Sequence, residues 1–313
     1  MKKLKSNSKC FILLCFILFS ILLAIPSFIN NSNKTVHASN TDSLHDYTTY
    51  DSINNIDNKI TYPSMTVHFI DVGQGNCILV QSNHSNMLID SGENMYSWYV
   101  VTYLKKCGVN KLDYVIATHA HDDHIGGMEK IIDNFQIDNF IMPKKTNTTS
   151  CYIDMLTKLT EHNISIISPI QLSSYNLGCG SFTILSPNID SEELSINNSS
   201  IMVKITDCNN SFLIGGDTEK SQEKLLVKQG IDLSANVLLL NHHGSKTSNC
   251  KDFLQAVNPN VAIISVGESN QYGLPSQDVL ERLDKLSIPY FSTANCGTIV
   301  ISSDGNSMEF HYE

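Results

Sequence analysis

Short apolar runs alternate with longer amphipathic stretches along most of the chain. Apolar runs bounded by glycine, proline or asparagine predict strands, and stretches with apolar residues at helical spacing predict helices. The predicted strands cover residues 66–72, 76–81, 86–90, 112–117, 140–142, 164–167, 182–185, 200–206, 211–214 and 237–240, and the predicted helices cover 96–107, 125–135, 152–162 and a stretch that begins at 218. Strands and helices that alternate in two successive blocks predict an α/β fold of two half-domains packed face to face.

The first 38 residues have the composition of an export leader. Lys2, Lys3, Lys5 and Lys9 precede an apolar run over residues 11–25, and a cleavage site is predicted after Ala38. Because the apolar run is near the upper length of a signal sequence, residues 1–38 are predicted to be a signal peptide or a membrane anchor. We therefore expect a secreted protein, or one anchored to the outer face of the cell membrane, with a polar linker over residues 39–63 and one catalytic domain over 64–313.

The charge balance argues against passive attraction to nucleic acid. Residues 1–38 hold five lysines and no acidic residue, so the rest of the chain has 16 basic and 31 acidic residues, a difference of −15. The only arginine is Arg282. Proteins that bind nucleic acid strongly usually neutralise its phosphates with many lysines and arginines. An anionic substrate would therefore have to be held by metal ions and local hydrogen-bond donors.

The cysteine pattern gives no disulfide or zinc-ribbon framework. The seven cysteines beyond the leader are odd in number and no two form a C-x-x-C motif, so most are expected to be small buried side chains. Export would permit disulfides, but the sequence does not choose between partners.

Three histidines and two carboxylates fall within residues 119–124, directly after the predicted strand at 112–117. His119 and His121 alternate by two and can face the same point, whereas Asp123 and His124 can address a second point nearby. Imidazole and carboxylate groups are ligands that divalent metals prefer. The stretch therefore predicts two adjacent metal ions in a loop at a strand end, where α/β folds place their ligands.

The same stretch resembles the H-x-H-x-D-H signature of the metallo-β-lactamase superfamily. Three further stretches narrow the resemblance to one branch of the superfamily: residues 69–76, 88–92 and 241–248. Together with the histidine-rich loop they resemble the hydrolase domain of ComEC-type competence proteins, including its free-standing relatives. The likeness extends from about residue 65 to residue 301. It implies a four-layer αββα sandwich with two metal ions at one edge between the sheets.

The resemblance also implies roles for residues outside this loop. Asp217 matches an aspartate that bridges the two metals, although alone it would be interpreted as a helix cap. Asp90 matches an aspartate that orients ligands, and a structural strand-end role is the alternative. One histidine of the pair at 242–243 should complete the second metal site; an extended backbone favours His242 and leaves His243 to face the substrate. The expected metal ligands are therefore His119, His121, Asp123, His124, Asp217 and His242, and the candidate catalytic residues are Asp123, His243 and Asp90. Zinc is the expected metal at both positions, and manganese is the alternative.

Two departures from the family pattern affect the prediction. The superfamily usually has a further histidine ligand between the histidine-rich loop and the bridging aspartate. The only candidate here, His162, ends a predicted helix, where a cation complements the helix dipole. ComEC-type domains often have an Asn-Asn-Ser stretch near that point, and residues 197–200 are Asn-Asn-Ser-Ser. What completes the first metal site therefore stays open. Near the C-terminus the relatives carry Tyr-Gly-His-Pro-His, whereas Leu274 and Ser276 replace both histidines here.

Taken together, these features predict an exported hydrolase with two divalent metal ions that cleaves phosphodiester bonds, in a small molecule or a nucleic acid, through activated water. Ser245, Lys246 and Thr247 are candidate donors to an anionic oxygen. The alternatives are a hydrolase of lactams, lactones or phosphocholine esters on the same scaffold, or a non-catalytic extracellular binding module stabilised by metal. No obligate protein partner is predicted.

Overall fold

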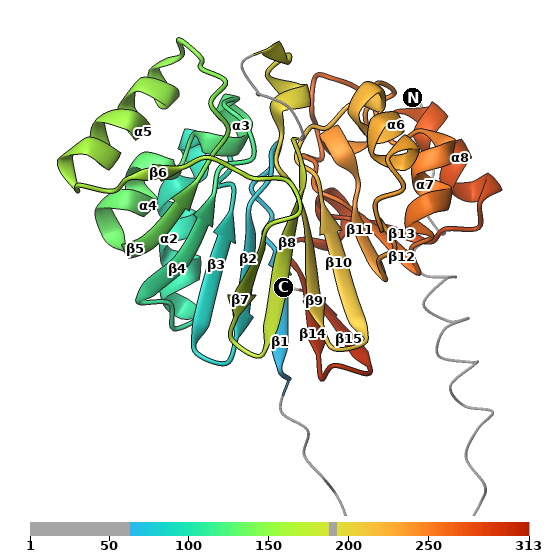
Figure 1. Ribbon diagram of the computed structural model, residues 1–313, viewed down its shortest axis with the longest axis horizontal. Helices are drawn as coiled ribbons and strands as arrows, with labels where there is room; N and C mark the ends of the chain where they lie inside the picture. The colour runs from blue at the N-terminus through green and yellow to red at the C-terminus, as the bar shows by residue number, and fades with distance from the viewer. Residues whose placement is uncertain (1–62, 188–192, 313) are drawn as a thin grey trace, which may run out of the picture. The chain divides into compact units, whose positions relative to one another are not determined.

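Two β-sheets face each other in the computed structural model, which describes residues 63–187 and 193–312 (Figure 1). The predicted leader and nearly all of the predicted linker lie outside these residues. The eight-stranded sheet has the order β15-β14-β1-β2-β3-β4-β5-β6. Its strands are β1 Met65–Phe69, β2 Ile78–Ser82, β3 Ser85–Ile89, β4 Lys111–Ile116, β5 Gln136–Ile141, β6 Ile166–Ile167, β14 Ile299–Ser303 and β15 Met308–Tyr312.

The second sheet has seven strands in the order β13-β12-β11-β10-β9-β8-β7. Strands β10 to β13 pair in parallel, whereas β7 to β10 pair antiparallel. Its strands are β7 Ser174–Leu177, β8 Gly180–Ser186, β9 Met202–Asp207, β10 Asn210–Ile214, β11 Val237–Leu239, β12 Val261–Ile264 and β13 Tyr290–Ser292.

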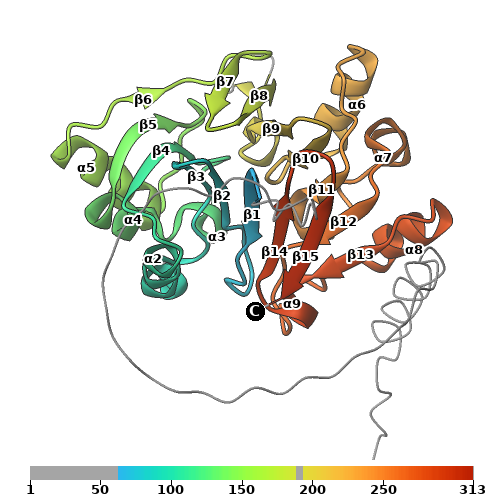
Figure 2. The same cartoon turned by 90° about the horizontal axis from the view of Figure 1, so that it is seen from below.

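Helices cover the outer face of each sheet (Figure 2). Helices α2, α4 and α5 pack on the eight-stranded sheet, and α6, α7 and α8 pack on the seven-stranded sheet. The predicted αββα four-layer sandwich is therefore confirmed. The helical segments are η2 Asn94–Tyr96, α2 Ser97–Lys106, α3 Asp122–Ile125, α4 Met128–Asn134, α5 Ser150–Glu161, η4 Asn197–Ser199, α6 Lys220–Lys228, η5 Asn241–Gly244, α7 Lys251–Val257, α8 Gln277–Lys285 and α9 Thr293–Cys296.

Three apolar layers hold this arrangement together. The middle layer lies between the sheets, and the outer two lie under the helices. Adjacent residues of one strand serve different layers: Leu88 packs under the helices, whereas Met87 and Ile89 pack between the sheets. Side chains alternate across a strand, so a strand buried on both faces must be apolar at consecutive positions. This is why these strands appear in the sequence as continuous apolar runs.

The helix predicted over residues 125–135 is interrupted at Gly126 and Gly127, which separate α3 from α4. A Cβ atom on Gly126 would lie 2.5 Å from the backbone nitrogen of Asn94, and one on Gly127 would lie 2.7 Å from the carbonyl oxygen of Ser91. The two glycines therefore let the metal loop, the segment around residues 119–124 that carries the predicted ligands, pack closely against the segment that follows β3. The prediction of a continuous helix was wrong because this close approach is a tertiary contact.

Among the described residues, no helix has the length and apolar character needed to cross a membrane. In the described part of the chain, free thiols occur at Cys77, Cys151, Cys179, Cys208 and Cys250.

Candidate metal centre

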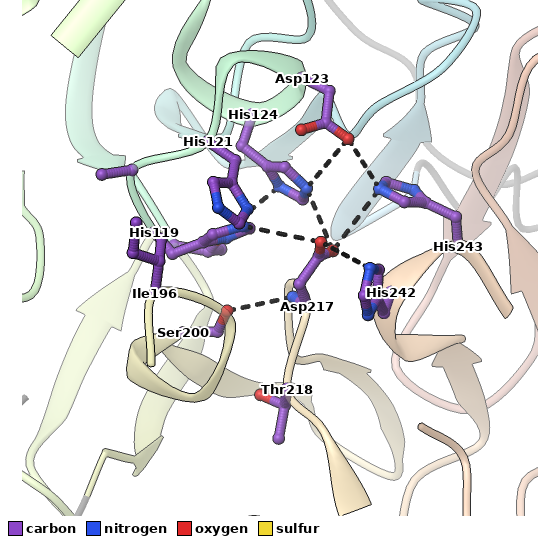
Figure 3. Close-up of polar contacts among 12 residues, drawn as sticks. His119, His121, Asp123, His124, Ile196, Ser200, Asp217, Thr218, His242 and His243 are labelled. Atoms are coloured by element: carbon purple, nitrogen blue, oxygen red, sulfur yellow. Dashed lines mark hydrogen bonds and ion pairs between the residues drawn. The ribbon is translucent and has the colours of Figure 1, made fainter. Parts of the chain in front are cut away.

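The predicted ligands converge at one edge of the sandwich because each follows the C-terminal end of a strand. The loop after β4 carries His119, His121, Asp123 and His124, and the turn after β10 carries Asp217. Segment η5, directly after β11, carries the histidine pair. Parallel strands bring their carboxyl ends to the same edge of a sheet, so segments far apart in sequence meet there (Figure 3).

His119, His121 and Asp217 form the first cluster, with one ligand atom from each lying within 4.8 Å of the others. His119 Nε2 lies 3.0 Å from His121 Nδ1 and 3.6 Å from Asp217 Oδ2. His119 is completely buried, whereas His121 is only partly buried. The alternation of the two histidines places both rings against one side of Asp217, as their spacing predicts.

Asp123, His124 and His243 form the second cluster under the same distance limit of 4.8 Å. His243 Nε2 lies 3.1 Å from Asp123 Oδ2, and His124 Nε2 lies 3.8 Å from the same oxygen. Asp217 stands between the clusters, because its Oδ1 lies 3.1 Å from His124 Nε2 while its Oδ2 faces His119. This is the geometry of a carboxylate shared by two neighbouring sites.

Asp217 is free to serve both clusters because it does not cap the following helix. The N-cap of α6 is Glu219, and its side chain makes no capping hydrogen bond. Instead, the Asp217 backbone nitrogen donates to Ser200 Oγ at 3.1 Å, which fixes the turn that carries the carboxylate.

The histidine pair differs from the expectation of an extended backbone. His242 and His243 both lie in the left-handed region, with φ of 52° at each residue. The turn buries His243 in the second cluster, whereas His242 remains partly exposed with Nε2 3.5 Å from Asp217 Oδ2. The choice of His242 over His243 rested on an extended backbone, and that premise was wrong. The geometry places His243 in the second cluster, and which of the two rings binds metal stays a prediction.

Asp90 makes the contacts that an orienting role requires. This fully buried carboxylate accepts hydrogen bonds from the backbone nitrogen and Oγ1 of Thr118, both at 2.8 Å. Its Oδ2 lies 2.7 Å from His124 Nδ1. A histidine whose Nδ1 is held in this way presents Nε2 to the centre. Thr118 was not among the predicted site residues, although it immediately precedes the histidine-rich loop.

The loop between β1 and β2 and the segment after β3 hold the backbone of the metal loop. The backbone nitrogen of Asn76 donates to the carbonyl oxygen of Asp123 at 3.1 Å, and Ser91 donates from its backbone nitrogen to the carbonyl oxygen of His124 at 2.7 Å. The stretches at 69–76 and 88–92, which carry part of the family resemblance, therefore hold the backbone of the predicted ligands.

His162 takes no part in either cluster. It caps the C-terminal end of α5, and its Nε2 lies 3.1 Å from Asp133 Oδ1. This agrees with the predicted helix-end role. The Asn-Asn-Ser-Ser stretch lies beside Asp217 instead, where Asn198 Oδ1 accepts a hydrogen bond from the Glu219 backbone nitrogen at 3.2 Å.

Two of the candidate donors after the histidine pair contact the His242 ring or each other. Thr247 Oγ1 lies 3.1 Å from His242 Nδ1 and 3.0 Å from Ser245 Oγ. Thr247 can therefore help to orient the His242 ring, Lys246 is exposed beside it, and donation to an anionic oxygen stays a prediction.

The charges in the centre suit divalent cations. Burial and the neighbouring His124 lower the pKa of His119, and burial lowers the pKa of His121, so both rings keep a free lone pair at neutral pH. Burial opposes ionisation of Asp217, but His124, His243 and His119 hold its pKa well below its usual range. His124 Nε2 and Asp217 Oδ1 are both buried without a hydrogen-bond partner in the described part of the chain. Buried imidazole nitrogens and ionised carboxylates that face one another fit metal ligation.

Comparisons with known proteins agree with the fold and identify the family. A model of the metallo-beta-lactamase superfamily matches residues 70–150. ComE operon protein 3 of Bacillus subtilis is 31% identical over 260 residues, which cover 76% of this chain and 33% of that protein. Recombination protein 2 of Haemophilus influenzae is 28% identical over 249 residues, which cover 78% of this chain and 29% of that protein. The chain therefore spans about a third of the length of these relatives.

Among solved structures, CmlA, a diiron beta-hydroxylase from Streptomyces venezuelae, has a TM-score of 0.50 at 13% sequence identity. The match covers 73% of this chain and 52% of that chain, and at this identity it concerns the fold alone. The family model, the order of the histidine and aspartate residues and the four-layer sandwich agree, so the chain belongs to the metallo-β-lactamase superfamily and resembles its ComEC-type competence proteins.

Proposed function

We propose that the protein is a hydrolase that uses two divalent metal ions and acts on phosphodiester bonds. The observation that carries this proposal is the position of Asp217, whose Oδ1 lies 3.1 Å from His124 Nε2 and whose Oδ2 lies 3.6 Å from His119 Nε2. One carboxylate thus serves two adjacent clusters. Paired cations suit a phosphodiester because they stabilise the attacking and the leaving oxygen together.

His119, His121 and Asp217 would hold one ion, and Asp123, His124, His243 and the shared Asp217 would hold the other. When bound, the two ions act as Lewis acids on the phosphoryl oxygen and lower the pKa of the attacking water. Zinc is the proposed metal because four of these donors are imidazoles, and manganese is the alternative because carboxylate oxygens also suit it.

The residues at the solvent side of the centre handle protons and orient the substrate. The Asp123 side chain is 25% exposed. Burial opposes its ionisation, but His124 and His243 lower its pKa, so the carboxylate is ionised and can accept a hydrogen bond from the attacking water. The His242 side chain is 22% exposed and lies beside Asp217, where it can donate to a substrate oxygen. Asp90 keeps the His124 ring oriented and does not touch the substrate.

Acidic groups near the centre favour a small phosphodiester over long DNA. Partial burial and the charges of Asp123 and Asp122 raise the pKa of Glu93, another acidic side chain near the second cluster. The net charge of the whole chain is −10. The relatives are named as competence and recombination proteins, which supports DNA as the alternative substrate.

We also propose that the protein is exported, since its first 38 residues have a basic start followed by an apolar run. Amino-terminal sequencing of protein recovered outside the cell membrane should find a start near Ser39 if the leader is cleaved. An intact Met1 on cytosolic protein would reject the localisation.

The test of the catalytic proposal is hydrolysis of a small chromogenic phosphodiester with and without a chelator. We expect activity that is lost on chelation and restored by zinc or manganese. A lactam, a lactone and a phosphocholine ester serve as comparison substrates, and a clear preference for one of them would reject the phosphodiester assignment. A metal-stabilised binding module would instead show a lower melting temperature on chelation with no activity to lose.

A further inference from the structure

A left-handed turn presents the histidine pair to the metal centre. His242 has φ 52° and ψ 46°, His243 has φ 52° and ψ 28°, and Gly244 follows with φ 77°. A non-glycine residue in this region is strained, and here two occur in succession. Such a conformation persists only where the surrounding structure holds it.

A buried carboxylate beneath the turn makes contacts that can hold it. Glu223 of α6 has 0% exposure. Its Oε1 accepts hydrogen bonds from Asn241 Nδ2 at 2.8 Å and from the Asn249 backbone nitrogen at 2.6 Å, and its Oε2 accepts one from the Cys250 backbone nitrogen at 2.8 Å. One side chain therefore joins α6, the residue before His242 and the start of α7.

Asn241 and Asn249 close the loop on themselves. The Asn241 backbone nitrogen donates to Asn249 Oδ1 at 3.0 Å, and Asn249 Nδ2 donates back to the Asn241 carbonyl oxygen at 2.8 Å. Arg282 of α8 donates to the carbonyl oxygen of Asn249. The His242 backbone nitrogen in turn donates to the Gly216 carbonyl oxygen at 2.9 Å, which ties the turn to the residue before Asp217.

The position of Glu223 is costly for folding. Burial raises its pKa even though Cys250, Asn241 and Asn249 donate to it. No lysine, arginine or histidine forms an ion pair with it within residues 63–187 and 193–312. A buried acidic group without a counter-charge is poor evidence for a stabilising role. Its hydrogen bonds to Asn241, Asn249 and Cys250 indicate instead that it maintains the geometry of the turn.

We propose that Glu223 is a positioning residue for the metal centre: it fixes Asn241, and thereby the left-handed turn that directs His243 Nε2 toward Asp123. The inference rests on the proposed metal centre. Glu223 acts through Asn241 and the loop 241–249 rather than by touching a ligand.

Titration of the metal-free full chain with Co²⁺ tests this role, because visible absorption reports the ligand geometry and equilibrium dialysis reports the affinity. Glu223→Gln replaces one acceptor oxygen with an NH₂ group, which leaves at least one of the three donors without an acceptor. We expect the affinity for one of the two ions to fall by roughly 10- to 100-fold, as for other groups that orient metal ligands, with a changed absorption band. The other ion should bind as in the wild type.

A second variant covers the case in which Glu223→Gln does not fold. Asn249 has φ 56°, a conformation that glycine adopts without strain, so Asn249→Gly removes the side-chain clamp on Asn241 and leaves the backbone unstrained. We expect the same loss at the same ion.

Asp207→Asn is the matched control. Asp207 is also 0% exposed and accepts hydrogen bonds from Ser64 Oγ and Ser303 Oγ, but it lies at the end of β9 remote from Ser200 and the metal centre. This variant should lower the melting temperature and leave both Co²⁺ affinities and the absorption unchanged. Wild-type affinity for both ions in Glu223→Gln and Asn249→Gly, or an equal loss of affinity in Asp207→Asn, would overturn the positioning role. A wild-type chain that binds no Co²⁺ would instead reject the metal centre itself.

Discussion

His243 Nε2 lies 3.1 Å from Asp123 Oδ2, although 120 residues of sequence separate the two. Asp123 follows a strand of the eight-stranded sheet, and His243 follows a strand of the seven-stranded sheet. His243 Nδ1 lies 2.8 Å from the carbonyl oxygen of Ser265, so it can donate there and leave Nε2 free for the centre. The second cluster therefore forms only when the two half-domains are packed together.

The first prediction concerns the histidine pair. His243→Ala removes a buried ligand atom of the second cluster, so we expect the protein to lose one bound ion and its hydrolytic activity. His242→Ala should keep both ions, because His242 belongs to neither cluster, and should lower the turnover rate. Metal content measured on both purified variants distinguishes them. Loss of an ion in His242→Ala, with both ions kept in His243→Ala, would restore the sequence-based assignment.

The second prediction concerns the first cluster. His121→Ala should lower the affinity for one ion by more than about 100-fold. It removes a direct ligand, whereas loss of an orienting group alone lowers metal affinity by about 10- to 100-fold. His162→Ala is the control, since that ring pairs with Asp133 at the end of α5. Equilibrium dialysis with zinc measures both variants. An equal loss of zinc in His162→Ala would mean that His162 is the missing histidine ligand after all.

The third prediction concerns the pH dependence of stability in the metal-free protein. Burial raises the folded-state pKa of Glu223 above the usual value of about 4.3. The stability that this group contributes is fully present below its unfolded pKa and is lost as the pH rises through the folded pKa. Wild type should therefore lose stability relative to Glu223→Gln as the pH rises from about 4 toward 7, because glutamine does not titrate. Urea unfolding midpoints of both proteins across this range provide the measurement, and a constant difference between them would refute the effect.

Most of the fold and the metal loop could be predicted from sequence because their signals are local. Consecutive apolar residues on β3 and β4 indicate strands buried on both faces, and the spacing of His119 and His121 is set by adjacent residues. The sequence-based prediction includes no strand beyond residue 240, although the consecutive apolar residues of β12 and β14 are typical of buried strands.

The rest of the site depends on tertiary contacts. The left-handed backbone at His242 and His243 is imposed by bonds to Gly216 and, through Asn241, to Glu223. Nothing at positions 242 and 243 distinguishes this turn from an extended segment. Glu223 itself gave no signal, because its partners Asn249 and Cys250 follow it by 26 and 27 residues in the chain.

The fourth prediction concerns the substrate. An acidic surface repels DNA at low ionic strength, so added salt should raise the rate on DNA, or leave it unchanged, by screening that repulsion. A protein that binds DNA through many basic residues shows the opposite, a steep loss with salt. Initial rates at fixed metal concentration, on DNA and on a small phosphodiester, give the comparison. A steep fall on DNA alone would reveal a basic track and favour the nucleic-acid substrate.

Two clusters that share Asp217 are proposed to bind two metal ions. The most direct test is the number of divalent ions per chain, measured by elemental analysis of the purified full-length protein after zinc loading and removal of free metal. We predict about two ions per wild-type chain and about one in His243→Ala. A wild-type chain that retains no divalent ion would contradict it.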